Sequence, residues 1–502
     1  MIKLNVSQNN IKDISGIKHL NSLECLTADN NQIGNIESLT NLKKLRIVNL
    51  SNNDITNIDT VKNWIKIQYL NLANNNIENI DSLNRLSELS EIYLDNNNIE
   101  DASYLPENKE SFLLNMSNNP IVKLPARMNF KVINLENCNL KNMDLVKNSP
   151  NLEHLCLRGN KIATISTLNS DNNILSMDLS KNEIADIKNI KNYPNIEELD
   201  LSSNKISDIT PLNHFYSKES FCKLNLSYNN IVDIDGLEGI ISITELNLSG
   251  NLLNDDVDFS KINAKILELG ENDFTKVVGI DKMKRLERLS INKNKSKLSF
   301  KSLKNLRNLS SLDISFNSIC DIEYAKLDNL YSLKADGIEL EHPSKLAVIA
   351  PNLKVLSYNE NSLKNISELS NFEHLEQLSL NAVKYENTSE FDVLSNIKNL
   401  RIISLNENHL SGIDFLKNLV QVECVLLDSN DIERIENLVN LRNIKVLNLA
   451  NNPIVDAVKL NEMDLKTLYL GEKAYNKYPE VKNARLMMNK ADFYQSYASI
   501  AF

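Results

Sequence analysis

The stretch Leu89-Ser90-Glu91-Ile92-Tyr93-Leu94-Asp95-Asn96-Asn97-Asn98-Ile99 carries the pattern that decides the fold. Apolar residues stand at its first, fourth, sixth and eleventh places, and an asparagine stands at the ninth. The ninth place recurs at a constant interval of 22 as Asn9, Asn31, Asn53, Asn75, Asn97 and Asn119, and it resumes at Asn160, Asn182, Asn204, Asn229, Asn251, Asn272, Asn294, Asn317, Asn361, Asn408, Asn430 and Asn452. Such a fixed period predicts an array of about 22 stacked turns, with Cys138, Ile338, Val383 and Lys473 in the asparagine place of the atypical ones.

The spacing within one turn predicts its local structure. The fourth and sixth places alternate with polar residues, which favours a short, half-buried strand. After the asparagine the apolar period becomes three, as in Ile77, Ile80 and Leu83, and this spacing is typical of a tight 3₁₀ return. Because strands stack more closely than returns, we expect an α/β repeat solenoid, a horseshoe with a concave parallel β-sheet and mostly 3₁₀ or irregular convex returns.

Asparagine has a structural part in this scheme. The chain holds about 80 asparagines, although this residue avoids helix interiors and favours bends. A buried amide at the ninth place both donates and accepts, and it therefore fits the backbone groups left where the chain leaves a strand. We expect Asn97 to be such a buried amide and its neighbour Asn96 to be exposed and freely exchangeable.

Composition and charge exclude several functional classes. The 11 glycines form no phosphate-cradling loop, so no nucleotide cofactor is expected. A net charge of -11 disfavours binding to nucleic acid or to an anionic membrane surface. No apolar run approaches the roughly 18 residues of a membrane span. The six cysteines lack metal-site spacing and suit reduced thiols, so we expect a cytoplasmic location, with secretion as the alternative if an upstream signal exists.

The repeat resembles the 22-residue leucine-rich repeats of the internalin and SDS22-like subfamilies. Internalin-like phrasing stands at Ile206-Ser207-Asp208-Ile209-Thr210-Pro211-Leu212 and again at Ile231-Val232-Asp233-Ile234-Asp235-Gly236-Leu237. Membership would imply a protein-binding solenoid. The internalin likeness implies a bacterial adhesin or effector, and the SDS22-like likeness implies a regulatory subunit of a phosphatase complex.

The expected organisation has two parts. Residues 1–473 form the array, with the least regular turns between residues 320 and 400. Residues 474–502, which hold Tyr475, Phe493, Tyr494 and Tyr497, form a helical cap on the last turn, or else a partner-binding peptide.

Departures from the repeat consensus on the concave face suggest a binding surface. One set is acidic and favours a partner with a basic surface, since such clustered carboxylates should gain nothing for the fold. The other set is apolar and would supply interface anchors. The alternatives are a solvated acidic face and isolated surface rings. The candidate partner-binding residues are Asp178, Glu198, Asp200, Glu245 and Glu268 in the acidic set, and Tyr69, Tyr93, Leu113, Tyr228 and Phe316 in the apolar set.

Two groups of residues have the types needed for a chemical site. His154 and Cys156, with Asp178 on the next strand, have the residue types of a thiol hydrolase but lie on an open sheet without oxyanion donors. The run Asp255, Asp256 and Asp258 has carboxylates for calcium but lacks the spacing of a calcium loop. We therefore predict no catalytic residues, no metal and no cofactor, and a non-enzymatic scaffold that binds a partner protein. The oligomeric state is left open.

Overall fold

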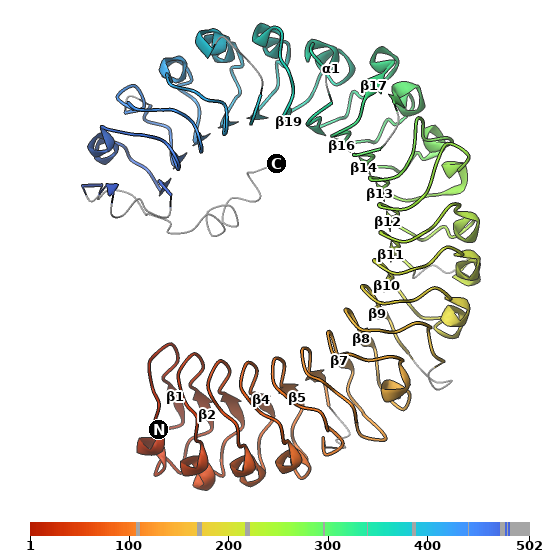
Figure 1. Ribbon diagram of the computed structural model, residues 1–502, viewed down its shortest axis with the longest axis vertical. Helices are drawn as coiled ribbons and strands as arrows, with labels where there is room; N and C mark the ends of the chain where they lie inside the picture. Colours follow the sequence, from red (N-terminus) through yellow and green to blue (C-terminus); the bar gives the residue numbers. More distant parts are fainter. Residues whose placement is uncertain are drawn as a thin grey trace. The chain divides into compact units, whose positions relative to one another are not determined.

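The computed structural model describes residues 1–106, 111–167, 173–215, 221–294, 297–338, 340–383, 388–439, 441–471, 477–478 and 480–481. The chain divides into two compact units, unit 1 (Met1–Asn251) and unit 2 (Leu252–Phe502). Each unit repeats one coil made of a three-residue strand and a return. Within each unit the strands lie on the inner side of the curve and the returns on the outer side (Figure 1).

The strands of unit 1 form a parallel ladder in which each strand pairs with the next at the same place of the repeat. Lys3 lies opposite Cys25, and Cys25 lies opposite Ile47. The strands are β1 (Lys3–Asn5), β2 (Cys25–Thr27), β3 (Ile47–Asn49), β4 (Tyr69–Asn71), β5 (Glu91–Tyr93), β6 (Leu113–Asn115), β7 (Val132–Asn134), β8 (His154–Cys156), β9 (Ser176–Asp178), β10 (Glu198–Asp200), β11 (Lys223–Asn225) and β12 (Glu245–Asn247).

Unit 2 continues the same parallel pattern, for example with Ile266 opposite Arg288. Its ladder holds β13 (Ile266–Glu268), β14 (Arg288–Ser290), β16 (Ser311–Asp313), β18 (Ser332–Lys334), β19 (Val355–Ser357), β20 (Gln377–Ser379), β21 (Ile402–Ser404), β22 (Cys424–Leu426), β23 (Val446–Asn448) and β24 (Thr467–Tyr469). A separate two-stranded sheet pairs β15 (Leu298–Ser299) with β17 (Ile319–Cys320).

The returns are mostly 3₁₀, which confirms the reading of the three-residue period. Ile77, Ile80, Leu83, Leu86 and Leu89 are all fully buried between neighbouring coils. The 3₁₀ segments are η1 (Ser15–Ile17), η2 (Glu37–Asn41), η3 (Asp59–Asn63), η4 (Asp81–Leu83), η5 (Asp144–Val146), η6 (Lys188–Asn192), η7 (Thr210–Phe215), η8 (Asp235–Leu237), η9 (Phe259–Lys261), η10 (Ile280–Lys282), η11 (Phe300–Leu303), η12 (Ile322–Tyr324), η13 (Ile366–Asn371), η14 (Thr388–Asn396), η15 (Asp414–Asn418) and η16 (Ala457–Glu462).

The ninth-place asparagines form the expected amide ladder. The Nδ2 group of Asn97 donates to the carbonyl oxygens of Leu72, Leu94 and Asp95 at 3.1, 3.0 and 3.3 Å. Its Oδ1 accepts from the backbone N–H of Ile77 at 2.9 Å. Each amide thus joins its own bend to the preceding coil, which explains why a side chain with both donor and acceptor recurs there.

The eighth place has a backbone requirement that the sequence interpretation missed. Asn96 has a φ of 56°, and the same left-handed conformation recurs at Asn30, Asn52, Asn74, Asn118, Lys181, Ser203, Tyr228, Glu271, Lys293, Phe316 and other eighth places. Asparagine tolerates this conformation better than alanine does. The expectation that Asn96 is freely exchangeable is therefore wrong.

The turns centred on Ile338 and Val383 lack the ninth-place amide but are still bonded to the amide of the next turn. Ile338 offers no amide, yet its own N–H still donates to Asn361 Oδ1 at 3.0 Å. Val383 is held in the same way by Asn408 Oδ1 at 2.8 Å. The α-helix of the described residues, α1 (Ser344–Ile349), forms the return after Ile338. Lys473 lies outside the described residues, as does most of the helical cap expected over 474–502.

Candidate binding surface of unit 1

The inner face of unit 1 presents two columns of side chains, from the third and fifth places of successive strands. The strand register places the third-place residues side by side in the order Tyr69, Glu91, Leu113, Val132, His154, Ser176, Glu198, Lys223 and Glu245. The fifth-place column runs Asn71, Tyr93, Asn115, Asn134, Cys156, Asp178, Asp200, Asn225 and Asn247. Seven of the ten predicted site residues therefore lie on one face of one unit.

A shallow depression of about 290 Å³ lies on this face over β5 to β9. Its walls include Tyr93, Leu113, Val132 and Cys156, and we call these four residues the inner-face patch. Asp178, on the last strand of the depression, borders the patch. Tyr69 extends the patch, since its ring centroid lies 5.4 Å from that of Tyr93. Burial, followed by the nearby carboxylate of Glu91, raises the pKa of the Tyr93 hydroxyl, so this hydroxyl stays neutral at neutral pH.

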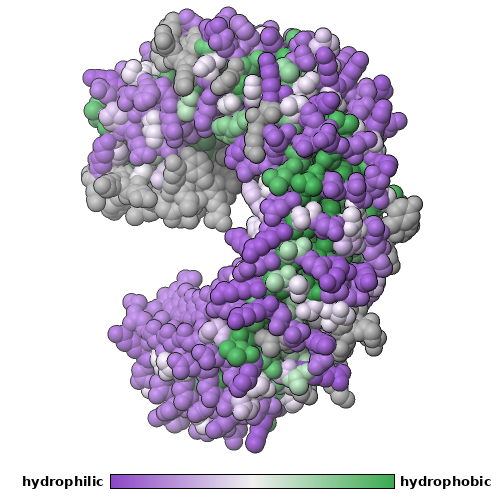
Figure 2. Space-filling view, turned by 45° about the vertical axis from the view of Figure 1, so that its right-hand side comes forward, coloured by the Kyte–Doolittle hydropathy of each residue, from purple (hydrophilic) through white to green (hydrophobic). Residues whose placement is uncertain are grey.

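The apolar lining distinguishes the patch from its surroundings. Figure 2 shows hydrophilic residues over most of the visible face, with hydrophobic residues gathered in smaller areas among them. Contiguous exposed apolar areas on a protein surface commonly mark interaction sites. Sequence reasoning missed Val132, although an apolar residue at the third place of the next strand after Leu113 was a sufficient signal.

The carboxylates beside the patch do serve the fold, contrary to the expectation that they gain nothing for it. Asp178 Oδ1 accepts from the backbone N–H and the hydroxyl of Ser180, at 2.9 and 2.6 Å. Asp200 Oδ1 accepts from the N–H of Ser202 at 2.8 Å, the bond that Asn225 Oδ1 makes with Ser227 at 3.1 Å. Aspartate therefore replaces asparagine in the same tight turn and adds a charge to it.

The acidic column is also partly neutralised. Glu198 Oε1 lies 3.0 Å from the Nζ of Lys223, which stands between Glu198 and Glu245 in the third-place column. The hydrogen bond with Glu198 raises the pKa of Lys223, so this lysine stays charged at neutral pH. Asp178 and Asp200 add two neighbouring carboxylates to this face, next to the apolar patch.

The three remaining predicted residues do not join this surface. Tyr228 takes the left-handed eighth place, and its ring lies against Gly250, where an added Cβ would meet Cδ1 at 2.5 Å. Phe316 in unit 2 lies in the same way against Gly337. Glu268, also in unit 2, has a raised pKa because it is largely desolvated. In the first two cases a glycine one turn later makes room for the ring.

The thiol of Cys156 is poorly suited to nucleophilic catalysis. Burial, which outweighs a backbone hydrogen bond, raises its pKa to about 11, and the neighbouring Asp178 carboxylate adds to the shift. A thiolate nucleophile needs the opposite environment, with a nearby cation or base. The Cys156 Sγ lies 3.9 Å from Asp178 Oδ2, while His154 is exposed in the adjacent column. This geometry supports a neutral thiol in an apolar wall.

The aspartates of the calcium hypothesis are engaged separately. Asp255 accepts from the backbone N–H groups of Thr275 and Lys276 at 2.7 and 3.0 Å, and Asp258 accepts from that of Ser260 at 2.8 Å. Within the described part of the chain, no group of three or more histidine, cysteine, aspartate or glutamate residues is placed to hold a metal ion.

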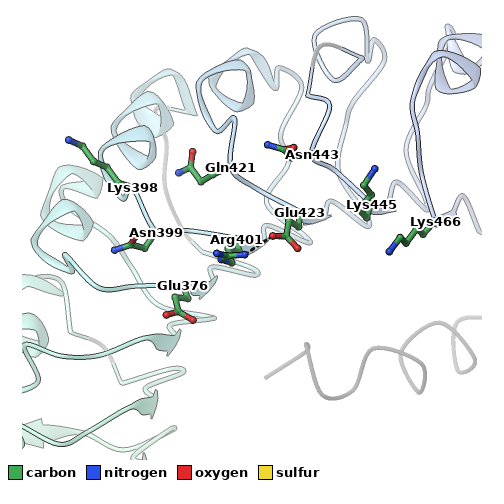
Figure 3. Close-up of a pocket in the computed structure, with 9 residues that line it drawn as sticks. All are labelled: Glu376, Lys398, Asn399, Arg401, Gln421, Glu423, Asn443, Lys445 and Lys466. Atoms are coloured by element: carbon green, nitrogen blue, oxygen red, sulfur yellow. Dashed lines mark hydrogen bonds and ion pairs between the residues drawn. The ribbon is translucent and has the colours of Figure 1, made fainter.

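A second hollow, of about 550 Å³, lies in unit 2 along the edge where the strands begin (Figure 3). It is charged rather than apolar. Arg401 Nη1 lies 2.8 Å from Glu423 Oε1, and Lys445 Nζ lies 2.6 Å from Asp464 Oδ2. These charged groups are already paired with one another, and exposed ion pairs contribute little energy in water. The hollow is therefore a weaker candidate for a binding site than the inner-face patch.

Comparisons with known proteins agree with the fold. A family profile described as "Leucine Rich repeats (2 copies)" matches residues 65–107 and 173–214, and one described as "Leucine rich repeat" matches residues 194–253. No curated protein sequence matches the chain.

Solved structures share the architecture at low identity. A structure of a TLR13–ssRNA13 complex is 17% identical with a TM-score of 0.56, covering 98% of this chain and 90% of that one. A TDR receptor is 16% identical with a TM-score of 0.51, covering 97% and 89%. An internalin from Listeria monocytogenes is 20% identical with a TM-score of 0.23, covering 89% and 86%. The first two of these likenesses show the fold alone. Among the described residues, no helix is both long enough and apolar enough to span a bilayer.

Proposed function

Because the chain is a leucine-rich-repeat protein, we propose that it is a non-enzymatic scaffold that binds a partner protein through the inner face of unit 1. The observation that carries the proposal is the inner-face patch, an apolar depression bordered by the carboxylates of Asp178 and Asp200. Apolar anchors beside two negatively charged carboxylates suit a partner that offers an apolar side chain next to basic ones.

The chemistry of the face supports a protein rather than a nucleic acid as the partner. The TLR13 structure is a complex with ssRNA, so the fold itself does not choose between the two classes. The net charge of this chain is -11, and nucleic-acid binding draws on a surplus of lysine and arginine. We further propose a cytoplasmic location, which is supported by the six cysteines, all of them free.

The test is binding kinetics against a partner captured with the full chain. Tyr93→Ala should raise the dissociation rate about 5- to 30-fold, since truncating an aromatic anchor costs about 1–2 kcal/mol. Tyr104→Ala is the matched control, because Tyr104 is an exposed tyrosine that lies outside the strands of the same unit. A control that weakens binding as much as Tyr93→Ala would place the site elsewhere.

The electrostatic half of the proposal has an isosteric test. Asp178→Asn and Asp200→Asn keep the turn bonds, since asparagine makes them at Asn225, and remove only the charge. They should slow association by a few-fold and flatten its salt dependence. Asp186→Asn is the matched control, because Asp186 makes the same kind of turn bond to the N–H of Lys188 outside the strands. Equal effects from the control would remove the role of the inner face.

A further inference from the structure

The inner face of β4 and β5, which lie side by side in Figure 1, holds a carboxylate next to two aromatic rings. In the third-place column Glu91 lies between Tyr69 and Leu113, and Tyr93 follows it at the fifth place of the same strand. The ring centroids of Tyr69 and Tyr93 are 5.4 Å apart, and the ring planes meet at 45°. After the larger effect of burial, the Glu91 carboxylate raises the pKa of the Tyr93 hydroxyl, so these two groups interact. We call Tyr69, Glu91 and Tyr93 the tyrosine–glutamate group.

Glu91 lacks the counter-ion that a glutamate has at the same place of another repeat. Glu198 Oε1 lies 3.0 Å from the Nζ of Lys223 on the next strand, whereas the strands beside Glu91 offer the uncharged Tyr69 and Leu113 at that place. Among the residues that the structure describes, no lysine, arginine or histidine nitrogen lies within 4.0 Å of the Glu91 carboxylate. A carboxylate beside apolar side chains costs free energy, and a bound cation would offset that cost.

The two rings favour a cation for a separate reason. The face of an aromatic ring is negative and attracts a cation that lies within about 6 Å of the ring centre. Asp95, at the seventh place of β5, adds negative charge nearby, although its two oxygens are occupied by the amides of Asn115 and Asn96, each at 3.0 Å. A guanidinium suits the group better than an ammonium does, because its plane stacks on a ring while its N–H fork donates to a carboxylate.

We propose that the tyrosine–glutamate group binds an arginine side chain of the partner protein. This contact rests on the proposed function and adds to it a second cationic position, at the opposite end of the depression from Asp178. Glu91 on β5 and Asp178 on β9 are four strands apart, which is about 19 Å at the usual strand spacing. The partner therefore carries two basic groups about 19 Å apart, with an apolar group between them for the inner-face patch.

The first test needs no partner. The probe is N-acetylargininamide, titrated into the full chain with isotope-labelled tyrosine rings and followed by NMR. The probe should shift the ring signals of Tyr69 and Tyr93, which Tyr69→Phe and Tyr93→Phe assign. Glu91→Gln should weaken its binding at least about fivefold, because this change removes the charge and keeps the shape. The matched control is Glu78→Gln, which removes an exposed carboxylate from a return of the same unit and should change the affinity by less than about 1.5-fold.

Two related probes separate recognition of a guanidinium from general attraction. N-acetylcitrullinamide has nearly the same shape without the charge and should cause no shift. N-acetyllysinamide has the charge without the planar fork and should bind at least about threefold more weakly than the arginine probe. Equal shifts from the citrulline probe, equal or tighter binding of the lysine probe, or no shift from the arginine probe would overturn the proposal.

The stability of Glu91→Gln checks whether this glutamate serves the fold instead. Its urea midpoint should equal or exceed that of the wild type, because the change removes a carboxylate that has no counter-ion. A lower midpoint would assign Glu91 a structural role and contradict the proposal.

Binding of a captured partner separates this proposal from the proposed function. Glu91→Gln should raise the dissociation rate of the partner about 3- to 10-fold. If Asp178→Asn slows association while Glu91→Gln and the arginine probe have no effect, the proposed function stands and the arginine contact is wrong. If the probe binds but neither variant changes binding of the partner, the inner face is not the contact surface, and both proposals fail.

Discussion

Replacing one ladder asparagine with alanine should leave about one buried backbone group without a hydrogen-bond partner. Asn97→Ala removes three donated bonds and one accepted bond. Two of the three carbonyls keep a side-chain partner, because Leu72 also accepts from Asn75 and Leu94 also accepts from Asn119. The third, on Asp95, keeps the backbone N–H of Asn74.

The group left without a partner is the buried N–H of Ile77. One such group costs about 1–3 kcal/mol, and we expect that loss in the free energy of unfolding. Urea denaturation measures the total, and amide hydrogen exchange locates it, since protection should fall first at Ile77. Loss of exchange protection in more distant coils should be smaller than at Ile77, because stability in a repeat array is coupled mainly between neighbouring repeats.

Two neighbouring substitutions make the prediction sharp. Asn98→Ala, at an exposed place of the same bend, should stay within about 0.5 kcal/mol. Asn96→Ala should cost about 1–2 kcal/mol through its left-handed backbone and should leave protection at Ile77 intact. If Asn97→Ala matched Asn98→Ala, or if exchange at Ile77 did not change, the assignment of the ladder as the support of the bend would be refuted.

Three further outcomes are expected. Gly236→Ala should destabilise by about 1–3 kcal/mol or more, because its Cβ would meet the backbone oxygen of Ile209 at 1.9 Å, whereas Gly16→Ala in the equivalent return has open space and should be neutral in the same denaturation assay. Cys156 should react with iodoacetamide at pH 8 about a hundredfold more slowly than an unperturbed thiol and accelerate as pH rises towards 11. Because the pKa of Cys156 is higher in the folded than in the unfolded protein, its buried neutral thiol stabilises the fold below the unfolded pKa near 9. That contribution to the free energy of unfolding is lost as pH rises through about 11, so Cys156→Ala should lose less stability than the wild type over that range.

Local spacing was sufficient for the coil and its ladder. A period of 22, with apolar fourth and sixth places and an asparagine at the ninth, specifies strand, bend and 3₁₀ return within one turn, and the bonds of Asn97 agree with it. These features depend on residues less than one period apart or on the same place of the adjacent turn. Sequence therefore predicts them wherever the repeat is regular.

The roles of the individual binding candidates were harder to predict. In the sequence, Asp178 and Asp200 look like departures from the repeat consensus. In the structure, each accepts the same turn hydrogen bond that asparagine accepts in other repeats. Tyr228 looks like an exposed anchor, yet its place requires a left-handed backbone and a glycine one turn later. Each role depends on where a side-chain atom lies relative to a neighbouring coil.

The sequence by itself determined the repeat, the coil and the amide ladder, because all three follow from periodicity and from hydrogen bonds within or between adjacent turns. Only the tertiary structure decided which inner-face residues make a surface: it joins Tyr93, Leu113, Val132 and Cys156 in one depression and buries Cys424 and Tyr469 at the end of unit 2. The physical reason is that exposure is a property of everything packed around a residue. A repeat pattern assigns a side chain to a face, but the atoms packed around it decide whether it meets solvent.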